Sequence, residues 1–157
     1  LDTLAASLDE LPEVWVLELS SFQLEDGGSG VRGFEPAAAT VLNVTQDHLD
    51  WHGTMAAYTA AKARVFGERA VMVLNHDDAL VEAMVPAPVV VKGKVKPSDR
   101  TLLRFGLTPP QRPGDFGLVE ENGMAWLVRA LPADETVKRK KGEAEEIHLQ
   151  RLMPADA

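Results

Sequence analysis

The sequence predicts an α/β fold in which a mostly parallel sheet with flanking helices is joined to a small antiparallel sub-sheet. Two observations support this prediction. In the first half, short apolar runs without polar alternation are separated by segments with helical spacing, a pattern typical of strands buried on both faces of a parallel sheet. In the second half, prolines punctuate the chain and an Asn-Gly pair separates two strand-like runs, which indicates an antiparallel hairpin.

A single domain is expected over residues 1–157. A chain of 157 residues can bury roughly two-thirds of its unfolded surface, which is enough for one core. Two full domains would need about 100–200 residues each. Hydrophobic residues make up 45% of the chain and charged residues 25%, as in a typical folded globular protein.

Strand-like and helical segments alternate through the first half. Leu1–Leu11 has apolar residues at helical spacing, so we expect a helix there that Pro12 ends. The elements that follow are expected to be strands at Val14–Leu19, Ala37–Asn43 and Ala70–Asn75 and helices at Thr54–Glu68 and Asp77–Met84. Thr54 is a suitable N-cap for the longer helix. This alternation favours parallel strands joined by right-handed crossovers.

The second half predicts antiparallel strands. Phe116–Glu120 and Met124–Ala130 flank Asn122-Gly123, a dipeptide that favours the two-residue turn of a β-hairpin. Ile147–Leu152 alternates between apolar and polar residues like a further strand. We therefore expect a small antiparallel sub-sheet attached to the parallel one.

Composition excludes several classes of protein. The chain has 16 Lys and Arg against 24 Asp and Glu, a net charge of -8, which argues against a protein that coats DNA or RNA. The basic run Lys138–Lys141 is followed by acidic residues and is expected to be a solvated loop. The absence of cysteine excludes disulfides, thiol catalysis and cysteine zinc sites. No apolar stretch approaches the roughly 18 residues of a membrane span, and no signal peptide pattern is present.

Glu18 is a carboxylate inside the apolar run Val14–Leu19, near its C-terminal end. Such a group is costly to desolvate unless it is paired or binds a metal. In open α/β sheets, ligands bind at the C-terminal ends of the strands. Metal binding and a capping role in the next loop are both open for this residue.

The stretch Asn43–Gly53, after the second predicted strand, is rich in metal-ligating side chains: Asp47, His48, Asp50 and His52. Carboxylate oxygens suit Mg²⁺, and imidazole can join them. Three interpretations stay open: a Mg²⁺ site, a polar loop whose Asp and Thr side chains cap backbone groups, and a metal-dependent hydrolase in which all four side chains share one ion. The helix is expected to begin after both histidines, which argues against a helical zinc pair.

Lys62 is the most informative single residue. It lies four residues after Tyr58 and four before Phe66, on the apolar row of the predicted helix. A lysine on a core face is rarely fully buried without a partner, and desolvation gives access to a neutral, reactive amine. The alternative is that its ammonium reaches solvent past Phe66.

Two common catalytic motifs are missing from the sequence. It has no G-x-x-x-x-G-K-[ST] phosphate-binding loop. Ser20 and Ser21 are not in a G-x-S-x-G elbow. A serine hydrolase is therefore not favoured.

Three motifs resemble, in order and spacing, the central domain of the Mur ligase family. They are Val16–Glu25 (VLELSSFQLE), Leu42–Gly53 (LNVTQDHLDWHG) and Tyr58–Lys62 (YTAAK). The resemblance covers roughly Val14–Leu80 and is weaker from Val89 onward. It implies a Rossmann-like, mostly parallel sheet.

What the resemblance implies about activity is an ATP-dependent amide-bond ligase of peptidoglycan precursor synthesis. Phe22–Glu25 looks most like the member that adds D-glutamate to UDP-N-acetylmuramoyl-L-alanine through an acyl phosphate. Another Mur ligase or folylpolyglutamate synthase is a near alternative. A non-catalytic binding or interaction module on the same scaffold is an alternative of a different class.

The resemblance also implies roles for individual residues. Metal ligands for Mg²⁺ would be Glu18, His48 and Lys62, with Lys62 and His48 catalytic, Lys62 carrying a carbamate, and Ser20 and Gln23 near the UDP-substrate. Asp47 and Asp50 would shape the loop.

The resemblance further implies a cytoplasmic enzyme that is monomeric at full length. The family's phosphate loop, N-terminal domain and C-terminal domain do not correspond to any part of these residues. We therefore expect the chain to be a partial central domain that neither hydrolyses ATP nor forms product alone.

Overall fold

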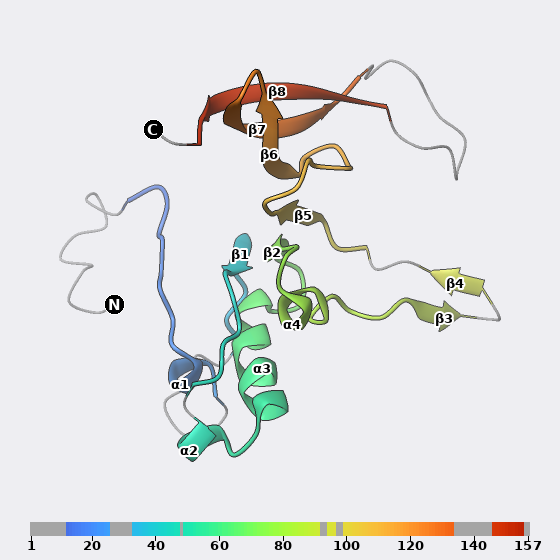
Figure 1. The fold of residues 1–157 in the computed structure, drawn as a ribbon. Helices are drawn as coiled ribbons and strands as arrows, with labels where there is room; N and C mark the ends of the chain where they lie inside the picture. The colour runs from blue at the N-terminus through green and yellow to red at the C-terminus, as the bar shows by residue number, and fades with distance from the viewer. Residues whose placement is uncertain are drawn as a thin grey trace.

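The computed structural model describes residues 12–25, 33–47, 49–91, 94–96, 99–133 and 146–155. The predicted helix Leu1–Leu11 and the basic run Lys138–Lys141 lie outside the described residues. The elements form a mixed α/β arrangement, with helices beside a parallel sheet and a separate antiparallel sheet (Figure 1). This confirms the fold class predicted from the sequence.

The parallel sheet has three strands in the order β1-β2-β5. Strand β1 is Ala38–Val41, β2 is Val71–Asn75 and β5 is Leu102–Phe105. Both pairings are parallel, so Thr40 lies beside Val73 in one ladder and Val73 beside Leu103 in the next. The sequence analysis predicted β1 and β2 but not β5.

Helix α3, Met55–Ala63, crosses between β1 and β2 and continues into a 3-10 turn, η2, at Arg64–Phe66. Thr54 is its N-cap, as predicted, because its side chain accepts a hydrogen bond from the Ala57 amide at 3.1 Å. This cap satisfies a backbone donor that the first helical turn leaves unpaired. Helix α4 covers only Ala79–Glu82, a shorter span than predicted, and begins at the Asp78 cap.

The core lies between the sheet and these helices. Its buried residues come from β1 and the loop after it, α3, η2, β2 and α4: Val41, Val44, Tyr58, Phe66, Met72, Leu74 and Val81. Tyr58 and Phe66 confirm the inward row predicted for the helix. Alternate residues of β2 point to this core, since Met72 and Leu74 are buried and their neighbours are half-buried.

The prediction of a strand at Val14–Leu19 is wrong. This segment has no strand assignment, and Val14 and Val16 are 73% and 93% exposed. Its side chains instead line one wall of an apolar groove whose other wall includes β1. An apolar run indicates that a segment is suited to burial, but a strand also needs a neighbour with which to pair, and none of the described strands pairs with this segment.

The antiparallel sheet contains β6 (Phe116–Glu121), β7 (Met124–Pro132) and β8 (Ile147–Pro154) in sequence order. Asn122 and Gly123 form the predicted turn, with φ of 54° and 76°. Both residues are therefore in the left-handed region that a two-residue hairpin of this type requires. A second, unpredicted hairpin pairs β3 (Val89–Val91) with β4 (Lys94–Lys96).

Two single-turn helices complete the described fold. Helix α1 is Ser21–Leu24 and α2 is Leu49–His52, and both contact α3 (Figure 1). The sequence analysis predicted neither. In particular, His52 ends a helical turn of its own instead of lying in an irregular loop. No helix among the described residues is long and apolar enough to cross a membrane.

Candidate functional site

Glu18 lies on the extended segment that leads into α1, and its side chain is exposed. The structure therefore corrects the expectation that this carboxylate lies inside a buried strand. Its carboxylate is open to solvent, so the cost of burying a charge does not require a partner or a metal at this residue.

Ser20 and Gln23 are brought together at the start of α1. The Ser20 amide and hydroxyl both donate to Gln23 Oε1, at 2.8 Å and 3.0 Å, and the Gln23 amide donates to Ser20 Oγ at 3.4 Å. This is a capping box, in which each side chain satisfies the other residue's backbone donor. Both residues are exposed, so the pair forms an ordered polar rim at the helix terminus.

Lys62 is half-buried near the C-terminal end of α3. Its Nζ donates to the carbonyl oxygen of Asn43 at 3.2 Å and lies 5.2 Å from the centre of the Tyr58 ring. The predicted position on the Tyr58–Phe66 face is thus confirmed for the stem of the side chain. The amine itself reaches the backbone just beyond β1, which joins α3 to the end of the parallel sheet.

Asp78 holds the same end of the sheet and was not singled out from the sequence. Its Oδ2 accepts from the Val44 amide at 2.7 Å, while Oδ1 accepts from Leu80 and Val81 at 2.9 Å and 3.2 Å. Burial opposes ionisation, but these three amides and the Lys62 charge outweigh it and lower the pKa of Asp78. The signal in the sequence was an aspartate directly before a short helical run.

The histidines of the Asn43–Gly53 stretch differ in what the structure describes. His48 lies outside the described residues, whereas His52 is buried. Asp47 and Asp50 are exposed. Within the described part of the chain, no three His, Asp or Glu side chains gather as a metal site. The described residues alone therefore do not make a complete metal site, and the four-residue hydrolase site has no support from them.

His52 joins α1 to α3 through contacts that the sequence did not reveal. Its Nε2 lies 3.0 Å from Ser21 Oγ, and its ring stacks on Phe22 at 5.6 Å between ring centres. On the other side the ring centre of Tyr58 is 5.2 Å away. The Lys62 amine lies over the Tyr58 ring, so one row of side chains in contact runs from α1 to Lys62.

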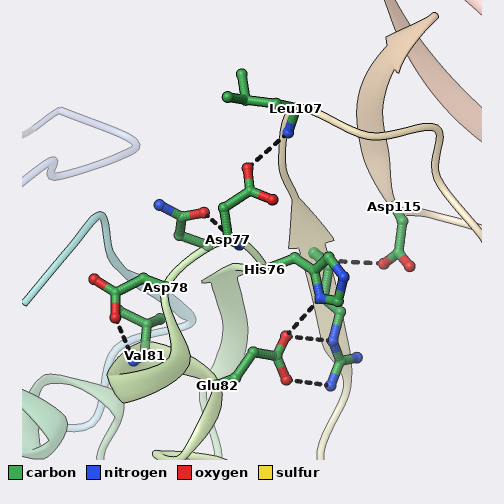
Figure 2. Close-up of polar contacts among 9 residues, drawn as sticks. His76, Asp77, Asp78, Val81, Glu82, Leu107 and Asp115 are labelled. Carbon is green, nitrogen blue, oxygen red and sulfur yellow. Dashed lines mark hydrogen bonds and ion pairs between the residues drawn. The ribbon is translucent and has the colours of Figure 1, made fainter.

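A second polar cluster lies where α4, β5 and the start of β6 meet (Figure 2). Glu82 accepts from Arg104 Nε at 2.7 Å and from Nη2 at 3.2 Å, and His76 Nδ1 is 3.5 Å from the same carboxylate. Arg104 lies next to a cavity of about 360 Å³ between these elements. The hydrogen bonds from the Arg104 side chain lower the pKa of Glu82 the most. The charge of Arg104 and the nearby His76 lower this pKa further.

Two aspartates complete this second cluster by holding backbone amides. Asp115 is buried and accepts from the Arg104 amide at 2.8 Å. Asp77 accepts from the Leu107 amide at 2.7 Å, which fixes the turn after β5 (Figure 2). Arg104 bonds to Glu82 of α4 through its side chain and to Asp115, just before β6, through its amide, so this cluster forms a joint between the two sheets.

Comparison with known proteins identifies the family. The Mur ligase middle domain family matches residues 1–100. The UDP-N-acetylmuramoylalanine–D-glutamate ligase of Albidiferax ferrireducens is 63% identical over the whole chain, and that of Polaromonas sp. is 62% identical. The corresponding ligase of Paraburkholderia phymatum is 48% identical over the whole chain.

The chain spans only part of these relatives. It matches 30%, 26% and 31% of the length of the three proteins, respectively. The match includes all three motifs on which the resemblance was based, since they lie between Val16 and Lys62. Because the family matches more than half of the chain's residues, the chain belongs to the Mur ligase family, within the middle domain.

Proposed function

We propose that this chain is part of an ATP-dependent ligase that joins D-glutamate to UDP-N-acetylmuramoyl-L-alanine in peptidoglycan precursor synthesis. The observation that carries the proposal is the 62–63% identity, over the whole chain, to two proteins named as ligases of that reaction. The order of the polar motifs on α1, the loop after β1 and α3 supports the same assignment.

The proposed reaction has two steps. The carboxylate of the UDP-substrate attacks the terminal phosphorus of ATP, which forms an acyl phosphate and releases ADP. The amine of D-glutamate then attacks the acyl carbon, loses a proton and expels inorganic phosphate as the amide bond forms. Bound Mg²⁺ would neutralise charge on the phosphoryl group during the transfer.

Within that ligase, we propose Glu18, His48 and Lys62 as the residues that hold Mg²⁺, with His48 and Lys62 catalytic. An exposed carboxylate at Glu18 is an oxygen donor of the kind that Mg²⁺ prefers. Lys62 is presented at the end of β1 by its bond to the Asn43 carbonyl. A neutral amine there would add CO₂ at nitrogen and release one proton to give a carbamate, which would supply oxygen ligands in place of nitrogen.

Ser20 and Gln23 are proposed to face the UDP-substrate. Both are exposed, and their mutual hydrogen bonds fix the direction of each polar group. A preorganised polar pair loses little side-chain freedom when a ligand binds. We further propose that the chain is a partial central domain, that the full ligase is a cytoplasmic monomer, and that ATP binds through residues outside these 157.

The proposal is tested in a full-length protein. The matched stretch of the A. ferrireducens ligase is replaced by residues 1–157, and phosphate release is measured with ATP, the UDP-substrate and an amino acid. We expect release with D-glutamate and none with meso-diaminopimelate or L-lysine. Release with one of the latter amino acids would instead assign the chain to another Mur ligase, and a folded but inactive chimera would support a non-catalytic module.

The metal and carbamate assignments need a readout other than activity. Mg²⁺ affinity and intact mass are measured on the same chimera with and without bicarbonate. We expect bicarbonate to add the mass of CO₂ and to strengthen Mg²⁺ binding, and we expect Lys62→Ala to abolish both effects. Glu18→Gln should weaken Mg²⁺ binding about 10- to 100-fold while leaving the added mass in place. Unchanged Mg²⁺ binding in both variants would contradict the assignment.

A further inference from the structure

We propose that His52 is a positioning residue that locks α1, which carries Ser20 and Gln23, onto α3, which carries Lys62. The inference rests on the proposed function, because that function gives the two helices their parts in the ligase site. The inference adds His52 to the residues that matter for the ligase site, although we propose no contact between His52 and the metal or a substrate.

The first part of the lock is a buried hydrogen bond. The His52 side chain is 0% exposed and Ser21 is 5% exposed, and the two meet at 3.0 Å between Nε2 and Oγ. The two residues are 31 positions apart in the sequence, and each belongs to a single-turn helix. Because single turns have little stability of their own, contacts of this kind must hold them in place.

The second part is a stack of rings that continues to the lysine. Phe22 of α1 lies against His52 with the rings inclined at 27°, and Tyr58 of α3 lies against it at 37°. The Lys62 amine is 5.2 Å from the Tyr58 ring centre, within cation–π range. The imidazole is thus the middle layer between the α1 surface and the side chain that we propose to be catalytic.

Glu25 lies near the opposite edge of the imidazole. Its Oε1 lies 3.7 Å from His52 Nδ1, and its Oε2 accepts from Trp51 Nε1 at 2.5 Å. The bond between His52 Nε2 and Ser21 Oγ forms with either imidazole tautomer, because a hydroxyl can donate or accept.

This arrangement is not a hydrolase triad, although it contains a serine, a histidine and a glutamate. Ser21 is buried, and its hydroxyl is directed to the imidazole. The 3.7 Å separation between His52 and Glu25 is too long for a hydrogen bond. The group is therefore suited to holding two helices together and not to attacking a substrate.

The test uses the active chimera, two variants of His52, one variant of Ser21 and their combination. His52→Phe keeps a ring between Phe22 and Tyr58 but removes the bond to Ser21. His52→Gln keeps a polar group within reach of Ser21 but removes the ring stack. His148→Gln, on the exposed face of β8, is the matched control.

Two readouts are taken for each protein: deuterium exchange of the peptide that contains α1, and the KM for the UDP-substrate and for ATP. In His52→Phe we expect exchange of α1 to rise roughly fivefold to tenfold, the effect of losing one buried hydrogen bond. KM for the UDP-substrate should rise by a similar factor while KM for ATP stays constant. Ser21→Ala should give the same result, the two changes together should add little, and His52→Gln should recover part of the loss.

Each outcome bears on a different statement. Unchanged exchange of α1 in His52→Phe would overturn the lock, whether or not the chimera is active. Faster exchange with unchanged KM for the UDP-substrate would overturn the positioning role. A parallel rise in both KM values, with faster exchange in the antiparallel sheet, would indicate general destabilisation and also overturn the proposal. An inactive unaltered chimera would count against the proposed function, and the exchange readout would still decide on the lock.

Discussion

Glu82 shows how a single side chain connects two elements and makes stability depend on pH. It lies at the end of α4 and binds Arg104 of β5 through two hydrogen bonds. Arg104 lowers the pKa of Glu82, so the folded chain holds the ionised form more tightly than the unfolded chain does. The resulting stabilisation is complete above the ordinary carboxyl pKa and is lost as the pH falls through the lowered pKa of the folded state.

Glu82→Gln should therefore lower the stability of the chain at neutral pH by about 2 kcal/mol, the contribution of a charge-assisted hydrogen bond. The difference from the unaltered chain should shrink as the pH is lowered into the acid range. Thermal unfolding followed by circular dichroism over a pH series checks this. Glu120→Gln, at an exposed position on β6, is the control. A deficit that does not change with pH would contradict the account.

Asp78 is the second residue with a direct prediction. Its carboxylate serves three backbone amides, two at the start of α4 and one at Val44 after β1. Asp78→Ala should cost more than the ~1 kcal/mol typical of a lost N-cap, because the Val44 amide is also left without its acceptor. Thr54→Ala removes a cap that serves only its own helix. In urea titrations, an equal loss from the two substitutions would contradict the link to β1.

At this scale the sequence predicted residues whose roles are local. The Thr54 cap and the inward face of Tyr58 follow from spacing along one helix, and the structure confirms both. The role of His52 could not be predicted, because its partner Ser21 is 31 residues away. Asp78 likewise contacts Val44 across 34 residues. Contacts between distant segments depend on how the elements pack, which periodicity does not report.

At the scale of elements, the joint between the two sheets depends on Gly117 in β6. A side chain at this position would place its Cβ 2.1 Å from the Thr108 carbonyl and 2.9 Å from Pro110. Gly117→Ala must therefore push away the backbone of the loop after β5. Gly123, in the hairpin turn, has open space around it but a φ of +76°.

We expect Gly117→Ala to destabilise the chain by about 3 kcal/mol, the upper range of overpacking. Gly123→Ala should cost only about 1 kcal/mol, from backbone strain alone. Deuterium exchange should also rise in the loop at residues 106–114 for the first variant and not for the second. Equal destabilisation by the two substitutions would show that the close approach at Gly117 relaxes without cost.

The elements that the sequence predicted are those with a strong local signal. The β6–β7 hairpin has its Asn-Gly turn, and β2 has a continuous apolar run. Strand β5 was missed because Leu102–Phe105 is short and follows a proline-rich stretch. The apolar run Val14–Leu19 predicts a strand, but pairing requires a neighbouring strand, and the sequence of one segment does not show whether a neighbour is present.

At the scale of the whole molecule, an apolar groove of about 730 Å³ separates Val14–Leu19 from β1. Val16 is 93% exposed and Leu17 is 45% exposed at this wall. Exposed contiguous apolar surface promotes association between copies of a chain. Sheet edges that lack a partner act in the same direction.

Val16→Ser combined with Leu17→Ser should therefore reduce self-association of the 157-residue chain without lowering its melting temperature. Sedimentation velocity over a concentration series measures the first effect, and thermal unfolding measures the second. Val81→Ser, at a residue with 0% exposure, is the contrasting change and should destabilise the core. If the double substitution lowers stability as much as Val81→Ser does, the side chains of Val16 and Leu17 are not exposed in the folded chain.

The family could be predicted from the sequence because its motifs are contiguous, and the comparisons bear it out over residues 1–100. The contacts within the proposed site could not be predicted, since they join segments that are far apart in the sequence. The described residues contribute a capped polar turn, a buried histidine and a half-buried lysine. These are the described parts of the site that we propose for the ligase.

We propose that the α1–α2–α3 region belongs to the reaction site of a D-glutamate ligase. The most direct measurement is the initial rate at which the chimera forms the D-glutamate-containing product, compared between the unaltered protein and Lys62→Ala. We predict D-glutamate-dependent product from the unaltered chimera and a loss of about 100-fold or more in the variant. Equal rates in the two proteins would contradict the claim.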